Sequence, residues 1–186
     1  MKTAHHLVLT ATAAAACVIL SASAQETATN STATNAPTSV VAPNKIVLTV
    51  VKVDSEETAG ENGSGTNAVD GNPNTFWHTQ WQDATPEHPH EIIIELTPPS
   101  TIKGFTYLPR QDDIDNGSIK DYEFYVSDDG KDFGQAVSKA TFESGKEKKT
   151  VTFQAKKCRF IKLKALSEIN GGAWTSAAEI GVVPND

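Results

Sequence analysis

Apolar side chains recur at every second position along much of this chain, and that alternation limits the folds open to it. In the segment EIIIELT, for example, Ile92, Ile94 and Leu96 share one face. A period of two is typical of a half-buried β-strand, and no long stretch shows the 3.6-residue period of a helix. The segments with strand character are 45–53, 91–97, 121–127, 150–155 and 159–166. Several short strands in about 140 residues predict an all-β fold, either a β-sandwich or a barrel.

Turn-forming pairs separate these segments, at Pro98-Pro99, Asn116-Gly117 and Asp129-Gly130. The core is expected to contain the side chains on the apolar face of each segment: Ile92, Ile94, Leu96, Tyr122, Phe124, Val126, Val151, Phe153, Ile161 and Leu163.

The first 44 residues differ in composition from the rest. Residues 1–24 combine Lys2, an apolar run and the small residues Ala22-Ser23-Ala24, which predicts a cleaved secretory signal peptide. Residues 25–44 are rich in Ala, Thr, Asn and Ser, which predicts a flexible leader. The domain is therefore expected to span residues 45–186. The protein is expected to be secreted, periplasmic or at the cell surface.

Cysteine is scarce in this chain. Cys17 lies in the predicted signal peptide and lacks the Leu that precedes a lipoprotein cysteine by three positions. Cys158 alone cannot form an intrachain disulfide, so the fold must depend on its core or on a metal.

The charge of the chain excludes two classes of partner. The net charge is −7, and removal of residues 1–24 takes away one Lys and no acid, which gives −7 − 1 = −8. Nucleic acids and anionic lipids attract clustered Lys and Arg, so we expect neither nucleic-acid binding nor membrane insertion. The basic run in residues 146–164 is expected to be a solvated strand face.

The segment 70–81, DGNPNTFWHTQW, places hard oxygen ligands beside two of the three Trp residues. Asp70, Asn72 and Thr75 have the chemistry that calcium prefers. An EF-hand is excluded, because Thr75 stands where that loop needs Gly and Trp81 where it needs Glu. Asx-turns that only reverse the chain are the alternative. We expect Trp77 to lie in the core.

Two strings, NAVDGNPNTFW (67–77) and AWTSAAEIGV (173–182), resemble the discoidin or coagulation-factor C-type domain. More narrowly, the chain resembles the family 32 carbohydrate-binding modules of exported bacterial proteins, over about residues 45–184. This resemblance implies a jelly-roll β-sandwich with one structural calcium ion. The ion would be held by carbonyls of Asn67, Asn72 and Ala178, the Thr75 hydroxyl and the carboxylates of Asp70 and Glu179.

The same resemblance implies a shallow sugar pocket. Neutral sugars are bound by aromatic faces that cover C–H groups and by fixed polar side chains that bond hydroxyls. Trp81 or Trp174 would stack on the ring, and Arg110 would donate two parallel hydrogen bonds. Galactose or N-acetylgalactosamine is favoured, with N-acetylglucosamine and fucose as further candidates. The residues expected to line the pocket are Glu61, His78, Trp81, Arg110, Asn116 and Trp174.

Other functions are weighed against this one. A small glycoside hydrolase would need a second carboxylate beside Glu61, and only Asp112, Asp113 or Asp115 could supply it. Phospholipid-binding relatives use apolar side chains on these loops, and none is evident in the sequence. An adhesive or structural envelope protein with the same fold is a further alternative. A separate glycan-degrading enzyme is a candidate partner, and we expect no catalytic activity in this domain.

Overall fold

The computed structural model describes residues 45–185. The predicted signal peptide, the leader and Cys17 lie outside this part of the chain, and Cys158 is a buried free thiol. The only helix among the described residues is a short 3₁₀ helix, η1 (Gly65–Val69). No helix in residues 45–185 is long and apolar enough to cross a membrane.

Antiparallel strands form the rest of the fold, as the alternation predicts. The main sheet has the order β1-β3-β6-β4-β5, and β8 pairs with β3. Its strands are β1 (Val47–Val53), β3 (His90–Leu108), β4 (Asp121–Ser127), β5 (Ser138–Thr141), β6 (Lys149–Ala165) and β8 (Glu179–Pro184). A second sheet contains only β2 (Trp77–His78) and β7 (Ser176–Ala177).

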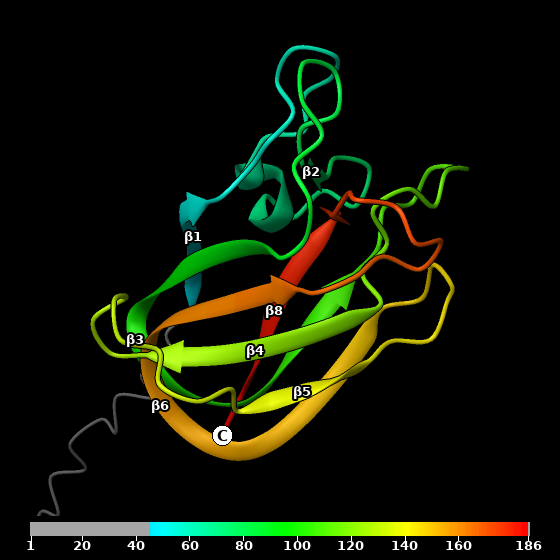
Figure 1. Cartoon of the computed structure of the whole chain (residues 1–186). Helices are drawn as coiled ribbons and strands as arrows, with labels where there is room; N and C mark the ends of the chain where they lie inside the picture. The colour runs from blue at the N-terminus through cyan, green and yellow to red at the C-terminus, as the bar shows by residue number, and fades with distance from the viewer. Residues whose placement is uncertain (1–44, 186) are drawn as a thin grey trace, which may run out of the picture. The chain divides into compact units, whose positions relative to one another are not determined.

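Two long strands make the main sheet into a sandwich. The first half of β3 pairs with β1 and with the second half of β6, which also pairs with β4. The second half of β3 pairs with β8 and with the first half of β6. Both strands curve between these halves, so that two layers of one hydrogen-bonded sheet face each other (Figure 1). The expected β-sandwich is confirmed.

Two of the expected boundaries are wrong. Pro98-Pro99 was expected to end a strand, but both residues lie within β3, and the segments 150–155 and 159–166 are one strand, β6. The pairing of β3 with β6 is interrupted between Glu95 and Ser100, at these exposed prolines. Proline has no N–H to donate, so it is tolerated where the ladder is interrupted. Local sequence shows the interruption but not that the strand continues beyond it.

Aromatic rings fill the space between the layers. Phe105 of β3 stacks on Phe124 of β4 with a centroid separation of 4.0 Å and an interplanar angle of 2°. Tyr122 and Phe142 stack beside them at 4.2 Å. The expected core residues are confirmed: Ile92, Ile94, Leu96, Tyr122, Phe124, Ile161 and Leu163 are buried, and Val126, Val151 and Phe153 pack partly buried against them. Trp77 is also buried, as expected.

The basic run on β6 lies on the outer face of the sheet. Lys162 lies 3.7 Å from Glu91, and Arg159 lies 2.6 Å from Glu95. Exposed ion pairs of this kind contribute little to stability. Lys156, Lys157 and Arg159 of this run are exposed and Lys162 and Lys164 are half-buried, which agrees with the expected strand face.

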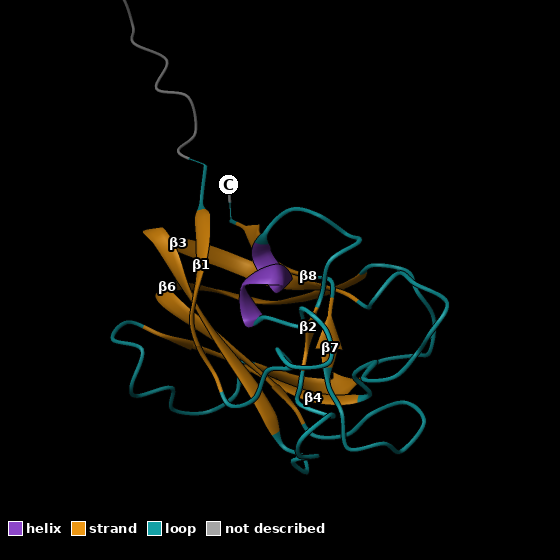
Figure 2. Ribbon diagram, turned by 90° about the horizontal axis from the view of Figure 1, so that it is seen from above, coloured by secondary structure: helices purple, strands orange, loops and turns teal. Residues whose placement is uncertain are grey.

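Long loops gather at one end of the sandwich, around the β2-β7 pair (Figure 2). The two strands of that pair come from distant parts of the chain, with His78 opposite Ser176. Backbone hydrogen bonds extend the contact, from Thr79 N–H to Thr175 O at 2.9 Å and from Ser176 N–H to Gly117 O at 2.7 Å. Three loops therefore meet at this end.

Replacement of Phe105 by Ala is expected to lower the free energy of unfolding by about 3–5 kcal/mol, because the ring is fully buried between the layers. Urea unfolding measures this change. Val51 is 48% exposed, so Val51→Ala should stay within about 0.5 kcal/mol of the wild type. A loss below about 1 kcal/mol for Phe105→Ala would contradict the assignment of this ring to the core.

Candidate functional site

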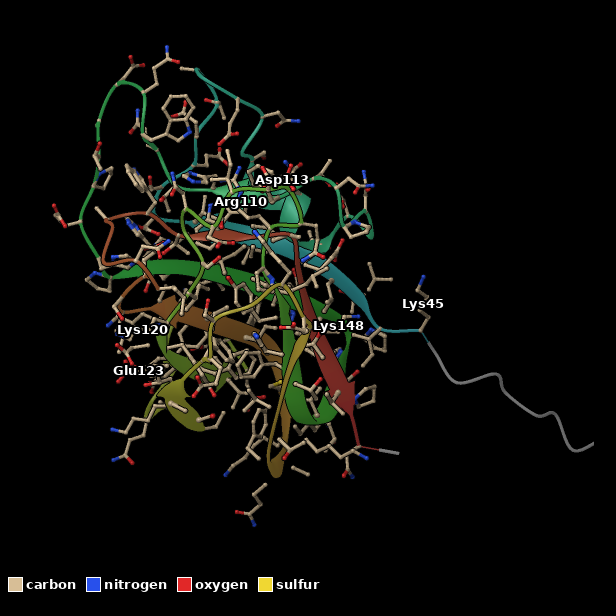
Figure 3. The ribbon with its side chains drawn as sticks, turned by 90° about the vertical axis from the view of Figure 1, so that its right-hand side faces the viewer. Lys45, Arg110, Asp113, Lys120, Glu123 and Lys148 are labelled. Atoms are coloured by element: carbon tan, nitrogen blue, oxygen red, sulfur yellow. The ribbon has the colours of Figure 1, made fainter. Side chains whose placement is uncertain are left out.

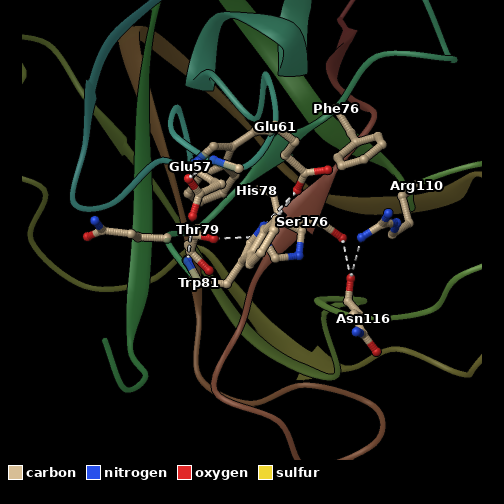
Figure 4. A network of polar contacts seen from close by, with 12 residues as sticks. Glu57, Glu61, Phe76, His78, Thr79, Trp81, Arg110, Asn116 and Ser176 are labelled. Atoms are coloured by element: carbon tan, nitrogen blue, oxygen red, sulfur yellow. Dashed lines mark hydrogen bonds and ion pairs between the residues drawn. The ribbon is translucent and has the colours of Figure 1, made fainter. Parts of the chain in front are cut away.

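The structure brings all six predicted pocket residues together. They line one cavity of about 360 Å³, and Ile114 completes its lining. Glu61 comes from the loop before η1, His78 from β2 and Trp81 from the loop after it, whereas Arg110 and Asn116 come from the β3–β4 loop and Trp174 from the β6–β7 loop. In Figure 3 Arg110 and Asp113 both lie toward the loop end. Figure 4 shows polar contacts around Glu61, His78, Trp81, Arg110 and Asn116.

His78 is an acceptor toward the cavity. Its side chain is buried, and Nδ1 lies 2.6 Å from the carbonyl oxygen of Thr79. A carbonyl oxygen only accepts, so Nδ1 carries the proton and Nε2 of the neutral ring can accept a hydrogen bond. Burial lowers the pKa of His78 below its ordinary value, which keeps the ring neutral at pH 7.

Trp81 and Glu61 line the cavity beside His78. Trp81 is 39% exposed, and its indole Nε1–H donates to Glu61 Oε1 at 3.0 Å. The indole lies directly over Gly60, where an added Cβ would be 2.5 Å from Cη2 of Trp81. An exposed, hydrogen-bonded indole with one open face can cover the C–H face of a ligand.

Arg110 is held on three sides. Its Nε and Nη2 donate to the two carboxylate oxygens of Asp112, at 2.7 and 2.5 Å. Nη1 donates to the carbonyl of Asn116 at 3.4 Å, and the guanidinium carbon lies 4.2 Å from the ring centroid of Phe76. Nη1 and Nη2 each have a second hydrogen that these bonds do not use and that can donate to a ligand. The hydrogen bond from Arg110 lowers the pKa of Asp112.

Asn116 contributes to this arrangement through its backbone. Its carbonyl accepts from Arg110 and from the Ser176 hydroxyl, the latter at 3.1 Å. Its side-chain amide makes no hydrogen bond to another residue in the range 45–185 and is exposed at the cavity. The side-chain role expected for Asn116 is compatible with this position.

Trp174 lines the cavity from a loop that is held by His90. The ring of His90 is fully buried, with Nδ1 2.7 Å from Asp54 and Nε2 2.9 Å from the carbonyl of Ala173. Both partners are acceptors, so both ring nitrogens carry protons and His90 is cationic. Burial alone would lower the pKa of His90, but these bonds and the charge of Asp54 raise it above its ordinary value of 6.5.

The site contains residues that sequence reasoning missed. Ile114 is 49% exposed and lines the cavity, although the sequence pointed only to the Asp residues of its loop, as candidate catalytic carboxylates. The sequence also did not show that Asp112 holds Arg110, that Glu57 holds the backbone of Trp81 or that His90 holds the loop of Trp174. No local pattern distinguishes these residues from ordinary loop residues, because their role depends on contacts with distant segments.

Four of the six predicted metal ligands, Asp70, Asn72, Thr75 and Glu179, lie close together between the loop 70–75 and the start of β8. Asp70 Oδ2 accepts from the Thr75 hydroxyl at 2.7 Å, and that hydroxyl lies 2.9 Å from the carbonyl of Asn72. The Asx-turn alternative is also present, because Asn72 N–H donates to Asp70 Oδ1 at 2.8 Å. Asn67 is buried beside this loop and Ala178 directly precedes Glu179.

Glu179 tests whether these residues fit a cation. Its Oε1 is buried and has no hydrogen-bond partner among the described residues. Burial and the negative charge of Asp70 raise the pKa of Glu179. No group of three or more His, Cys, Asp or Glu side chains in residues 45–185 is arranged to hold a metal. Two carboxylates with a hydroxyl and carbonyl oxygens nevertheless fit a hard cation such as calcium.

Comparisons with known proteins agree with this geometry. The model of the F5/8 type C domain matches residues 50–180. A sialidase of Micromonospora viridifaciens is 40% identical over 136 residues, which cover 73% of this chain and 21% of that protein. The chain spans about a fifth of the length of that sialidase, and between 10% and 17% of the length of four further curated relatives.

Solved structures of binding modules are similar to the whole domain. A family 32 module of Clostridium perfringens in complex with GalNAc-β-1,3-galactose is 36% identical, with a TM-score of 0.67 over 73% of this chain and 94% of that one. A second family 32 module of that organism, in complex with galactose, is 29% identical, with a TM-score of 0.62 over 73% and 92%.

Stability should fall as the pH rises through the raised pKa of His90, above 6.5. The protonated ring makes both bonds, so its contribution is complete below pH 6.5 and is lost when the folded protein releases the proton. Denaturant unfolding at pH 6 to 9 and a His90 ring NMR titration would measure this. Asp54→Asn removes the charge that raises the pKa of His90, so in this variant the loss of stability should begin at a lower pH. A His90 that titrates below 6.5 would contradict the assignment.

Proposed function

Because the chain belongs to the F5/8 type C domain family and is similar to solved family 32 carbohydrate-binding modules, we propose that it binds terminal galactose or N-acetylgalactosamine on glycans. The observation that carries this proposal is the convergence of two Trp residues, an end-on Arg and two acceptors on one cavity. Small-ligand sites combine apolar surface with a few convergent polar groups in this way.

The polar groups suit an axial hydroxyl. An axial O4 can accept from the free end of Arg110 and donate to His78 Nε2 or to the free oxygen of Glu61. The same axial position leaves one face of the ring rich in C–H groups, which Trp81 can cover. Asn116 is placed to bond a neighbouring hydroxyl. Arg110, His78, Glu61 and Trp81 are held by other contacts before ligand arrives, which lowers the ordering cost of binding.

Ile114 favours N-acetylgalactosamine within this class. An exposed aliphatic side chain at a cavity gains free energy when a ligand covers it. Lys146 holds its loop, because Nζ lies 2.6 Å from the carbonyl of Ile114 and 2.6 Å from Asp115. The methyl of a 2-acetamido group is an apolar substituent of a galactose-configured sugar that could make this contact.

The proposed role is non-catalytic. Glycoside hydrolysis normally uses two carboxyl groups, one of which has a raised pKa and acts as the acid. Asp112 is paired with Arg110, which lowers its pKa and makes it a poor general acid. Asp115 is paired with Lys146 at 2.6 Å. Neither is suited to act with Glu61, and the third candidate, Asp113, does not line the cavity.

A structural calcium ion is part of the proposal. Carboxylates of Asp70 and Glu179, the Thr75 hydroxyl and carbonyls of Asn67, Asn72 and Ala178 would hold it. The buried, unpartnered Oε1 of Glu179 supports this assignment. An ion bound here would neutralise two neighbouring carboxylates and join residue 70 to residue 179, which closes a long loop. Its role would be stability and preorganisation.

Export and a partner enzyme complete the proposal. The predicted signal peptide at residues 1–24 supports a secreted or cell-surface location. The sialidase relative is far longer than this chain, so its module is one part of a larger protein. The domain proposed here would bring glycans to the cell surface or to a separate glycan-degrading enzyme.

An amide NMR titration of the calcium-loaded protein with galactose, N-acetylgalactosamine and N-acetylglucosamine tests the sugar site. We expect saturable shifts at His78, Trp81, Arg110 and Trp174, with millimolar to high micromolar Kd. Arg110→Ala and Trp81→Ala should each weaken binding at least roughly tenfold. Lys103→Ala, outside the cavity lining, is the matched control. The absence of shifts with both galactose-configured sugars would overturn the proposal.

Removal of calcium with a chelator is expected to lower the Tm. At about one hundred times its Kd a ligand stabilises the folded state by about 2.7 kcal/mol, which is roughly 8 °C for a domain of this size. Asp70→Asn should abolish most of the response to added calcium, which differential scanning calorimetry can measure. Asp83→Asn, which removes a carboxylate from another loop, is the control. An unchanged Tm with calcium in the wild type would exclude the ion.

A further inference from the structure

We propose that two buried carboxylates, Glu57 and Glu168, are positioning residues that set the two indoles of the cavity, Trp81 and Trp174. The proposal rests on the function proposed above, because it concerns the side chains that would cover the sugar. Neither carboxylate lines the cavity. Each carboxylate accepts hydrogen bonds from backbone N–H groups. These groups belong to the loop that carries one indole or to the glycine on which that indole lies.

Glu57 joins two loops through four hydrogen bonds. Its side chain is fully buried. Oε1 accepts from Ala59 N–H and Gly60 N–H, each at 2.8 Å. Oε2 accepts from Trp81 N–H and Gln82 N–H, also each at 2.8 Å. The bonds from Gly60, Trp81 and Gln82 lower the pKa of Glu57 to about 2, so this carboxyl group is ionised at neutral pH.

The position of Trp81 follows from these bonds. Glu57 brings Gly60 and the backbone of Trp81 to one carboxylate, and the indole then lies on Gly60 with its Nε1–H on Glu61. The backbone of Glu57 also bonds the cavity strand, since its N–H donates to His78 O at 2.8 Å. Glu57 therefore connects the loop of Glu61, the strand of His78 and the loop of Trp81 (Figure 4).

Glu168 holds the loop of Trp174 in a related way, through the residues just before the Trp. Its side chain is 2% exposed, and Oε2 accepts from Asn170 N–H at 2.7 Å and from Gly172 N–H at 2.8 Å. An added Cβ at Gly172 would lie 3.1 Å from Cε3 of Trp174, so that indole also rests on a glycine whose N–H bonds the carboxylate. The following carbonyl, of Ala173, is the one that His90 holds.

A carboxylate is suited to this task. Loop N–H groups have no ladder partner, and a single neutral acceptor cannot satisfy four of them. Gln has nearly the shape of Glu but replaces one acceptor oxygen with an NH₂ that faces two N–H donors. Glu57→Gln should therefore break the hydrogen bonds of one pair of N–H groups without creating a cavity. The pair is either that of Trp81 and Gln82 or that of Ala59 and Gly60.

The experiment compares Glu57→Gln and Glu168→Gln with two control variants in full-length protein. Glu56→Gln is the neighbouring control, because Glu56 Oε2 accepts from Gly65 N–H at 2.8 Å, in η1. Asp129→Asn is the second, because Asp129 accepts from the N–H groups of Lys131 and Asp132 in the β4–β5 turn, at 2.8 and 2.9 Å. Indole Nε1–H resonances, sugar Kd and Tm are measured for each.

We expect Glu57→Gln to shift the Trp81 indole resonance and Glu168→Gln to shift that of Trp174, each with little effect on the other. Each should weaken the Kd of the better-bound galactose-configured sugar roughly five- to tenfold. In a Trp81→Ala background Glu57→Gln should weaken it no further, since coupled residues are not additive. The controls should leave both indole resonances and the Kd unchanged.

The proposal is overturned if Glu57→Gln or Glu168→Gln is folded but leaves its indole resonance in place, or weakens binding no more than its control. If either variant does not fold, hydrogen exchange of the wild-type amides tests whether the carboxylates hold these loops. The exposed loop amides of Ala59, Gly60 and Gln82 must be protected, as must those of Asn170 and Gly172, and rapid exchange would overturn the proposal. Indole shifts without any sugar binding would retain the positioning role and overturn only the proposed function.

Discussion

The short pairing of β2 with β7 is the constraint on which the cavity depends. It places His78 opposite Ser176, and the bond from Ser176 to Gly117 adds the β3–β4 loop to the same point. The buried hydroxyl of Tyr107 strengthens this junction, because it donates to Ser176 O and accepts from Ile119 N–H, both at 3.0 Å. Segments separated by about a hundred residues can contribute to one cavity only because this junction exists.

Loops at the junction are held by hydrogen bonds to carboxylates and to one histidine. Glu57, Glu168, Asp112 and the His90–Asp54 pair each satisfy polar groups that would otherwise be costly to bury. Rigid loops matter for a site that binds a small neutral ligand through few contacts, because such a ligand cannot supply much ordering free energy itself. The family 32 neighbours are complexes with sugars of this kind.

Alternation identified β1, β4 and the first part of β3, together with most of the core, because a half-buried strand must alternate to separate core from solvent. It failed at Pro98-Pro99 and between residues 155 and 159, where a long strand crosses between the layers and the side chains of Pro98, Pro99, Lys156 and Lys157 are exposed. The short strands β2, β5 and β7 gave no local signal, since two to four residues are too few to show a period. Trp77 and its neighbours were found by family resemblance to the motif at 67–77.

The sequence by itself determined the fold class, the core faces of the main strands and, through its resemblance, the residue types that meet at the cavity. Only the tertiary structure decided which side chains hold the others and which are left free. Arg110 presents its end because Asp112 takes its side, and Trp81 is placed by Glu57 from another loop. Ile114 is exposed at the cavity and Glu57 is buried, although both stand in acidic loops. Burial and hydrogen-bond partners depend on distant segments, so no local pattern contains them.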